Sequence, residues 1–461
     1  MTMWRPDIDG LTGPRYKAIA DCLAADLQAG RLAPGDRLPT HRELAEQLEL
    51  TVGTVTRAYA EAERRGLVRG EVGRGTYVAE QDARYDPLLE PARDPAGMID
   101  LGLNLPLYAE DPDLAGALRD LGRRRDLASL LCYQPFAGHD RYRQAGADWI
   151  ARHGLEVAPE QVVITAGAQH AIVVALGALG RAGDVVLSEE LTYPGLKTAA
   201  TLLGLEVAPV AMDADGLMPD ELDRVAGETG ARLLYCMPTL HNPTTRTMSA
   251  ARRREIAAVA RRRGLTLVED DVHGLLDTAH ASPLASLIPE RTVYIASTSK
   301  VVAGGLRVAY VAAPGDLVER LAFAVAASLW ALPAISLELA ALWIEDGTAA
   351  AVTGRKREEA AARQELARRV LPEAQFQEAA RSYFLWLELP EPWRSDDFVR
   401  AARKRGVIVS PAEAFAAGQA APPAAVRVSL SSPRTREDLE TGLRTLAELL
   451  ARGPAPQAAI V

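Results

Sequence analysis

Between Met98 and Pro314 the chain alternates short apolar runs with longer segments of helical period. The runs are QVVITAG, GDVVLSE, ARLLYCMPT, GLTLVEDD, RTVYIAST and RVAYVAAP, and segments such as ARRREIAAVARRRG separate them. Short, continuously apolar strands that alternate with helices are typical of a parallel sheet. The alternation therefore predicts an α/β domain in which helices cover a mostly parallel sheet.

The sequence on either side of this region has a different character. Residues 1–78 form a small, mostly helical unit, and residues 79–97, rich in Pro, Asp, Glu and Ala, indicate a linker. After residue 316 come long helices rich in Ala, Arg and Glu, then the strand patterns YFLWLEL and VRVSL. We expect a large domain over 98–316, a small α+β domain over 317–453 and a loose tail over 454–461.

Charge and cysteine content exclude several classes of protein. The formal net charge of −9 argues against a general nucleic-acid coating role, although a small DNA-reading module on an acidic body remains compatible with it. Cys22, Cys132 and Cys236 lie far apart, so we expect neither a disulfide framework nor a metal site. The N-terminus lacks a signal peptide pattern, and the longest apolar run contains a proline and Glu338. These features favour a cytoplasmic protein without a membrane span.

The N-terminal unit carries the pattern of two short helices joined by a tight turn. Thr40 and Glu43 form a capping box before a helix that we expect to end at Leu50, and Thr51 can cap the next helix, VGTVTRAYAEAERRG. The following LVRGEVGRGTYV indicates a β-hairpin with a Gly-rich tip. This is a helix-turn-helix with a wing, and its second helix would enter the DNA major groove by its N-terminal end.

Residues 11–78 resemble the GntR-type winged-helix family through LPTHRELAEQL, GTVTRAY and GRGTYV. Val52 stands where that family often has arginine, so we expect an altered base preference. The alternative is a winged helix used only as a protein interface. The resemblance implies DNA contacts by Arg42, Thr51, Thr54, Arg57 and Arg74.

The segment YIASTSKVVAGGLRVAYV places a lysine at the end of a predicted strand. The Lys300 amine can form a Schiff base with an aldehyde, as pyridoxal phosphate requires. Ser297 and Arg307 flank it at positions suited to a phosphate. Taken alone, the motif is also compatible with an exposed lysine in a Gly-rich loop.

The segment LVEDDVHGL places Glu269, Asp270 and Asp271 at the carboxyl end of a strand, where the sites of parallel sheets lie. One carboxylate can pair with a pyridinium nitrogen, and we assign Asp270 to this role. A metal site or a surface acidic cluster is the alternative for this motif alone.

Two further motifs complete the candidate site. Asn242, before Pro243, offers an amide donor to the 3′ oxygen of the cofactor ring. Gly167, Ala168 and Gln169 join a strand to a helix whose free N–H groups can hold a phosphate. Tyr193 could stack on the ring, although a tyrosine before proline is also an ordinary loop residue.

The order and spacing of these motifs resemble the fold type I aminotransferases over residues 98–452. The resemblance implies pyridoxal 5′-phosphate as cofactor, with Lys300 as its Schiff-base lysine. It further implies that Tyr133 reaches the phosphate of a partner subunit across a dimer interface and that Arg427 binds an amino acid carboxylate. The implied roles of the other residues are the pyridine nitrogen for Asp270, the 3′ oxygen for Asn242, ring stacking for Tyr193, and the phosphate for Gly167, Ala168, Gln169, Ser297 and Arg307.

Three positions depart from the pattern of those relatives. His273 stands where many have a tyrosine near the 3′ oxygen, which changes ring electronics and pH response. Ala168 replaces a commoner serine, and Arg381 and Ser382 replace a frequent pair of glycines. These changes preserve cofactor attachment and put turnover in question.

A GntR-type reader followed by an aminotransferase-like body resembles the MocR/GabR family of regulators over nearly the whole chain. The resemblance implies a head-to-tail homodimer that binds operator DNA and senses GABA, taurine, another amino compound or pyridoxal phosphate itself through an aldimine at Lys300. The main alternative is a working aminotransferase with an accessory DNA-binding domain. A third is a DNA-binding scaffold whose body is inert.

Overall fold

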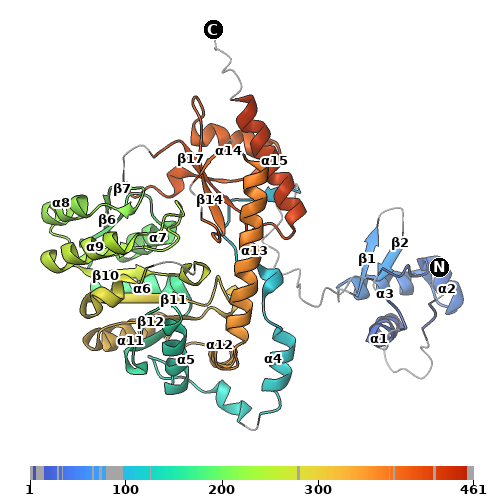
Figure 1. Ribbon diagram of the computed structural model, residues 1–461. Coiled ribbons are helices and arrows are strands. Elements are labelled where there is room, and N and C mark those ends of the chain that lie inside the picture. Colours follow the sequence, from blue (N-terminus) through green and yellow to red (C-terminus); the bar gives the residue numbers. More distant parts are fainter. Residues whose placement is uncertain are drawn as a thin grey trace. The chain divides into compact units, whose positions relative to one another are not determined.

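In a computed structural model the chain divides into two units, one up to Pro91 and one from Ala92 (Figure 1). The predicted linker up to residue 96, the tail over 454–461, and Arg74 lie outside the described residues. The structure describes residues 4–6, 15–28, 31–33, 35–64, 67–71, 75–78, 97–124, 126–277, 281–372, 374–376, 379–418 and 422–453.

The first unit is a winged helix-turn-helix, as predicted. Its elements are α1 (Arg15–Gln28), α2 (His41–Gln47), α3 (Val52–Arg64), β1 (Val68–Glu71) and β2 (Gly75–Val78). The two strands pair in antiparallel fashion, from Val68 opposite Val78 to Glu71 opposite Gly75, and form the wing.

Local hydrogen bonds explain where the helices of this unit begin. The Thr40 side chain accepts from the Glu43 N–H, and the Glu43 carboxylate accepts from the Thr40 N–H, which confirms the capping box. Thr51 Oγ1 accepts from the Thr54 N–H at 3.2 Å and caps α3. The expected end of α2 at Leu50 was wrong: the helix ends at Gln47, because Glu49 takes a left-handed conformation with φ of 53°.

Apolar side chains three or four residues apart on α1 and α3 meet in one core. This core includes Ile19, Leu23, Leu44, Val55 and Tyr59. Because these residues point inward, α3 presents its other face to solvent, and Val52 is 45% exposed there.

The second unit is built on a seven-stranded sheet of order β4-β12-β11-β10-β9-β5-β6. All neighbours are parallel except β12, which is antiparallel to β11 and β4. The strands are β4 (Val162–Thr165), β5 (Val185–Glu189), β6 (Glu206–Val210), β9 (Leu233–Cys236), β10 (Thr266–Asp270), β11 (Thr292–Ser297) and β12 (Ala309–Ala312).

The six predicted strands of this sheet are all present, and β6 was missed. Its sequence, EVAPV, contains a proline and a charged residue, and only Val210 is buried. Such a pattern is compatible with an edge strand, where one side of the ladder needs no partner.

Helices cover both faces of the sheet, because successive strand residues point to opposite sides. Val186, Tyr235 and Val268 belong to one apolar cluster with α6 and α11, whereas the adjacent Leu187 and Leu267 belong to another with α8 and α9. The helices of this part are α4 (Leu114–Leu121), α5 (Asp140–Ala151), α6 (Ala168–Leu179), α7 (Pro194–Leu203), α8 (Pro219–Thr229), α9 (Ala250–Arg263), α10 (Leu284–Leu287), α11 (Gly315–Leu329) and α12 (Ala334–Glu345). A short hairpin joins β7 (Met212–Asp213) to β8 (Gly216–Leu217).

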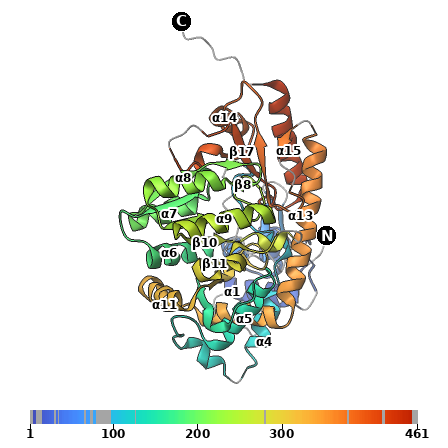
Figure 2. The same ribbon diagram turned by 60° about the vertical axis from the view of Figure 1, so that its left-hand side comes forward.

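The long helix α13 (Thr348–Val370) runs from α12 to a smaller α+β domain (Figure 2). A four-stranded antiparallel sheet of order β13-β14-β17-β16 forms that domain. In addition, β15 (Val407–Ile408) pairs in parallel with β3 (Ile99–Asp100), at the start of the second unit. The remaining elements are β13 (Gln375–Phe376), β14 (Phe384–Glu388), β16 (Ser410–Pro411), β17 (Ala425–Ser429), α14 (Ser395–Lys404) and α15 (Arg436–Arg452).

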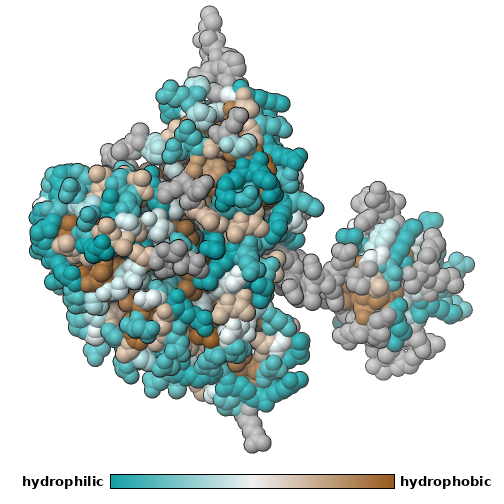
Figure 3. Space-filling view, viewed as in Figure 1, coloured by the Kyte–Doolittle hydropathy of each residue, from teal (hydrophilic) through white to brown (hydrophobic). Residues whose placement is uncertain are grey.

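The face of the second unit seen in Figure 3 is mostly hydrophilic, with small apolar patches. Within the described ranges, no helix is both long and apolar enough to cross a membrane.

Candidate functional site

Several predicted site residues lie at the carboxyl ends of neighbouring strands. Asp270 ends β10, Ser297 ends β11, and the loop with Asn242 follows β9. Carboxyl ends of adjacent parallel strands meet at one edge of a sheet, which is where α/β proteins bind ligands. Lys300 follows β11 by three residues and lies at this edge.

Asp270 is buried and hydrogen-bonded to a tyrosine on the next strand. The Tyr235 hydroxyl donates to Asp270 Oδ2 at 2.7 Å, and the Val272 N–H donates to Oδ1 at 3.3 Å. The strand register explains this contact, because Tyr235 lies opposite Val268, two residues before Asp270 on the same face. Burial raises the pKa of the Asp270 carboxyl to about 6, although the Tyr235 hydrogen bond opposes the shift.

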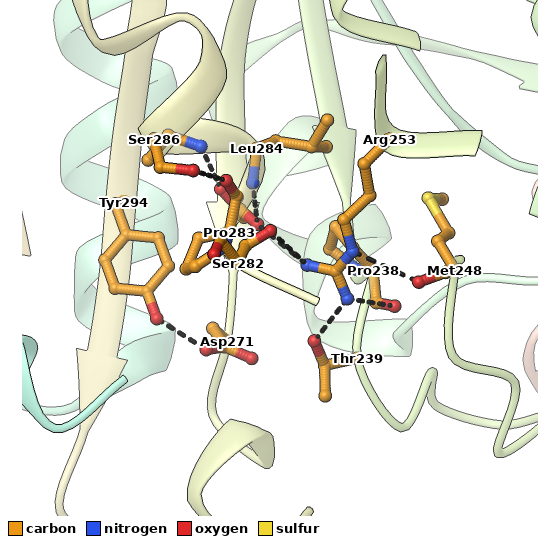
Figure 4. A network of polar contacts seen from close by, with 12 residues as sticks. Pro238, Thr239, Met248, Arg253, Asp271, Ser282, Pro283, Leu284, Ser286 and Tyr294 are labelled. Atoms are coloured by element: carbon orange, nitrogen blue, oxygen red, sulfur yellow. Dashed lines mark hydrogen bonds and ion pairs between the residues drawn. The ribbon is translucent and has the colours of Figure 1, made fainter. Parts of the chain in front are cut away.

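The other two carboxylates of the EDD motif have separate partners. Asp271 accepts from the Tyr294 hydroxyl (Figure 4) and pairs with His153 Nδ1 at 2.9 Å. Glu269 accepts from the N–H groups of Leu284 and Ala285. These contacts tie Asp271 and Glu269 to the surrounding structure.

A buried arginine on α9, Arg253, contacts Pro238, Thr239 and Met248 (Figure 4), which belong to the loop that carries Asn242. The Arg253 guanidinium donates to the carbonyls of Pro238 and Met248 and to Thr239 Oγ1 at 2.9 Å. It also lies 3.9 Å from Glu269 Oε1. The arginine therefore fixes both ends of the loop that joins β9 to α9.

The Lys300 amine points into the same region. It donates to the Asn104 carbonyl, and the Tyr383 hydroxyl donates to the Lys300 carbonyl at 2.9 Å. Burial, together with Arg427 and Arg307, lowers the pKa of the Lys300 amine to about 7. A larger share of the amine is therefore neutral and nucleophilic at neutral pH than in an exposed lysine.

Arg307 and the start of α6 form the candidate phosphate site. Gly167 precedes the first residue of α6, Ala168, and a Cβ there would lie 2.4 Å from Arg307 Nη2. Arg307 donates weakly to Ser299 Oγ at 3.4 Å, and the Ser299 N–H donates to Ser297 Oγ. The first N–H groups of a helix have no partner within it, so this corner offers N–H donors and a guanidinium together.

Gln169 and Tyr193 lie at the same corner. Gln169 Nε2 donates to the Gly195 carbonyl at 2.9 Å, and a Cβ on Gly195 would lie 2.3 Å from the Tyr193 ring. Tyr193 immediately precedes α7 and is half-buried. Position 195 therefore leaves no room for a side chain beside the ring.

Asn242 and Arg427 contact each other directly. Arg427, on β17, donates from Nη1 to Asn242 Oδ1 at 2.8 Å and from Nη2 to the Gly102 carbonyl at 2.6 Å. Its guanidinium lies over the ring of Phe415, 4.8 Å from the ring centre. Burial lowers the pKa of Arg427 to about 10, so the group is cationic at neutral pH.

His273 is buried between Asn104 and Phe384. Its Nε2 lies 3.1 Å from Asn104 Nδ2, and burial lowers its pKa to about 3, so the imidazole is neutral. Tyr133, by contrast, is 85% exposed and makes no contribution to this cluster within one chain's described residues.

Within the described part of the chain, several buried polar atoms of this region have no hydrogen-bond partner, which is expected of a region that fits a polar ligand. Each would cost free energy if left without a hydrogen bond. They belong to side chains around Lys300 and Asn242: Asn104 Oδ1, Gln169 Oε1, Thr192 Oγ1, His273 Nδ1 and Arg427 Nε. A helix start beside Arg307, a buried carboxylate, a lysine amine with a lowered pKa and a buried cationic arginine have the chemistry that pyridoxal phosphate and the carboxylate of an amino acid require.

Sequence reasoning missed three residues of this site. Tyr235 was included only as part of an apolar strand, although a tyrosine there needs a partner for its hydroxyl. Asn104 and Tyr383 carried no usable signal, since their partners lie far away in the sequence.

The predicted DNA contacts that the structure describes lie on α2 and α3 or between them. Arg42 is on α2, Thr51 caps α3, and Thr54 and Arg57 are on α3. Arg42, Thr51 and Arg57 are exposed, whereas Thr54 is half-buried and its hydroxyl lies 2.9 Å from that of Thr51. Arg74 lies outside the described residues.

Comparison with protein families identifies both units. Residues 96–446 match the model for aminotransferase class I and II, and residues 15–78 match that for bacterial regulatory proteins of the gntR family. These matches confirm the predicted fold classes and their order.

Individual relatives agree with this assignment. The chain is 34% identical over 447 residues to the uncharacterized HTH-type transcriptional regulator YdeF of Bacillus subtilis, covering 97% of this chain and 96% of the relative. It is 29% identical to the HTH-type transcriptional regulator TauR of Rhodobacter capsulatus, covering 88% and 90%.

Among solved structures, it is similar to LysN, an alpha-aminoadipate aminotransferase from Thermus thermophilus, complexed with N-(5′-phosphopyridoxyl)-L-leucine. The TM-score is 0.70 at 26% identity, over 77% of this chain and 92% of the other. The chain therefore belongs to the HTH-type transcriptional regulators of MocR type, in which a gntR-family DNA-binding domain is fused to an aminotransferase class I and II domain.

Proposed function

We propose that this regulator binds pyridoxal 5′-phosphate at Lys300 and responds to an amino compound, or to the cofactor itself, by changing its affinity for operator DNA. The observation that carries the proposal is the Lys300 amine, whose pKa burial lowers to about 7, at the centre of a polar site in a chain that begins with a DNA reader. When bound, the cofactor supplies an aldehyde for this amine and an electron-withdrawing ring.

Each residue of the site has a role in this proposal. Asp270, held by Tyr235, keeps a proton on the ring nitrogen, and Asn242 and His273 face the 3′ oxygen. Gly167, Ala168, Gln169, Ser297 and Arg307 hold the phosphate, and Tyr193 stacks on the ring. Arg427 receives the carboxylate of the amino compound.

A head-to-tail homodimer is part of the proposal. Tyr133 is 85% exposed, as expected for a side chain that reaches the phosphate of a partner subunit. Two linked DNA-binding domains would bind two half-sites of the operator and thereby gain avidity.

The test is a mobility-shift assay of the full chain with duplexes from the region upstream of its gene, with and without pyridoxal phosphate and amino compounds. A retained duplex whose affinity changes with cofactor supports the proposal. If no duplex is retained, while addition of a keto acid and an amino acid gives sustained conversion of both, the protein is a working aminotransferase instead.

Attachment of the cofactor should depend on pH through Lys300. Because the amine must be neutral to attack an aldehyde, the attachment rate should rise about tenfold per pH unit below about pH 7 and level off above it. Absorbance after mixing apoprotein with pyridoxal phosphate measures this rate. A rate that keeps rising to pH 10 would show that Lys300 titrates like an exposed lysine.

The Arg57→Ala variant should bind the retained duplex more weakly. Arg57 is exposed on α3, and loss of an arginine contact to a base or phosphate costs about 1–3 kcal/mol. Fluorescence anisotropy at fixed salt measures the effect. Arg31→Ala is the control, because it removes the same charge from the same unit, where Arg31 forms an ion pair with Asp26. Equal losses of DNA affinity in the two variants would contradict a groove contact by α3.

A further inference from the structure

A short segment that follows β3 contacts the two cationic side chains of the site, Lys300 and Arg427. We refer to residues 102–105 as the strap. The Lys300 amine donates to the Asn104 carbonyl, and Arg427 Nη2 donates to the Gly102 carbonyl at 2.6 Å. The large domain supplies Lys300 and the small domain supplies Arg427, so one short piece of backbone accepts hydrogen bonds from both sides of the site.

Contacts outside the ligand groups define the conformation of the strap. Asp100 Oδ1 accepts from the N–H of Gly102 at 2.7 Å and of Leu103 at 3.2 Å. Ser410 Oγ donates to the Gly102 carbonyl at 2.8 Å. Immediately before the strap, β3 pairs with β15 of the small domain. Asp100 thus anchors the strap without touching Lys300.

The Asn104 side chain also contacts His273. Asn104 Nδ2 lies 3.1 Å from His273 Nε2. Within the described residues, His273 Nδ1 is buried without a hydrogen-bond partner. Asn104 is therefore a positioning residue for the imidazole ring.

We propose that the strap reports which groups occupy the ligand site, because its carbonyls bind the same two side chains that a cofactor and an amino compound require. This inference rests on the proposed function and specifies its regulation. Attachment of the cofactor withdraws the Lys300 amine from Asn104, and a ligand carboxylate draws Arg427 away from Gly102.

The chemistry of Arg427 determines how a ligand carboxylate changes its hydrogen bond to Gly102. Both terminal nitrogens already donate, one to Asn242 and one to Gly102, while Nε is buried without a partner. A carboxylate received bidentately on the Nε edge shares one terminal nitrogen with these acceptors. Because a carboxylate carries a full negative charge and the Gly102 carbonyl does not, the guanidinium binds the carboxylate more strongly, which weakens the contact to the strap.

The position of the strap in the chain makes this contact suitable for signalling. The strap and β3 are the first part of the second unit after residues 79–96, which connect it covalently to the winged helix. The strap is therefore next in sequence to the segment that joins the two units, and in this proposal a change in the strap couples binding energy at the ligand site to DNA affinity.

Two ligands that differ in one carboxylate test the proposal. N-(5′-phosphopyridoxyl)-L-leucine has the ring, the phosphate, the leucine side chain and an α-carboxylate, whereas N-(5′-phosphopyridoxyl)-3-methylbutylamine has the same ring, phosphate and side chain and lacks only the carboxylate. Hydrogen exchange of the full chain should be about fivefold faster or more in peptides covering residues 102–105 with the first ligand than with the second. Equal exchange with both bound ligands overturns the inference and leaves the proposed function intact. Failure of both ligands to bind, measured by calorimetry, contradicts the proposed function and the inference together.

A matched pair of variants tests the anchor. Asp100→Ala removes the acceptor for two strap N–H groups, whereas Asp100→Asn keeps an oxygen in its place. In Asp100→Ala the two ligands should have the same effect on DNA affinity, and in Asp100→Asn their difference should persist. If Asp100→Ala binds both ligands and keeps the parental difference in DNA affinity, the strap does not carry the signal.

Discussion

A Lys300→Ala variant should lose all covalent retention of pyridoxal phosphate. After incubation with the cofactor, borohydride reduction and denaturation, the parent chain should carry one phosphopyridoxyl group and the variant none, as measured by intact mass. The reason is chemical, since only a primary amine forms the reducible bond, and Lys300 combines a pKa of about 7 with a position among the candidate phosphate and ring contacts.

Lys197 provides a demanding control for this experiment. Its amine donates to the carbonyls of Ala414 and Ala416, and burial lowers its pKa as well. If lowered pKa alone decided attachment, Lys197→Ala would lose label too. We expect Lys197→Ala to retain the parental label, and a label on residue 197 in the Lys300→Ala variant would refute the assigned site.

Replacement of Arg253 by alanine should destabilise the second unit by about 3–5 kcal/mol, the range for breaking a buried ion pair. The guanidinium is 1% exposed and donates to Pro238, Thr239 and Met248, as Figure 4 shows. Its loss removes a donor from each of these acceptors and removes the cation that is paired with Glu269, whose pKa burial raises to about 7. Urea unfolding followed by tryptophan fluorescence measures the change.

The neighbouring Arg254 is a matched control, because it lies on the same helix and is exposed. Arg254→Ala should change stability by no more than about 0.5 kcal/mol. Equal unfolding midpoints for the two variants would mean that the Arg253 network contributes little. Because Arg253 supports the Asn242 loop, the Arg253→Ala variant should also bind phosphopyridoxyl-leucine more weakly.

The sequence was sufficient to predict the helices and strands whose residues are buried in a regular pattern. The strands β4, β5, β9, β10, β11 and β12 are buried over nearly their whole length, and the capping box at Thr40 is a local motif. The edge strand β6 lacks that pattern, because solvent takes the place of one neighbour. The end of α2 depended on the backbone of Glu49, which no residue preference specified.

The site could be predicted where a motif follows a strand, as with Asp270 and Lys300, because the sheet itself brings such residues together. The hydrogen-bond partners of these residues could not be predicted. Asn104 is 196 residues before Lys300, and Tyr383 is 83 residues after it. Their contacts follow from how the small domain closes on the sheet, which no local pattern encodes.

The pairing of β3 with β15 has a consequence for synthesis of the protein. Residues 99–100 leave the ribosome early, but their partners at 407–408 are made some 300 residues later. At about 5–20 residues per second, the reader is complete on the order of tens of seconds before β3 finds its place. The nascent chain thus has a finished winged helix first, and the candidate ligand site can close only after residues 407–408 have been made.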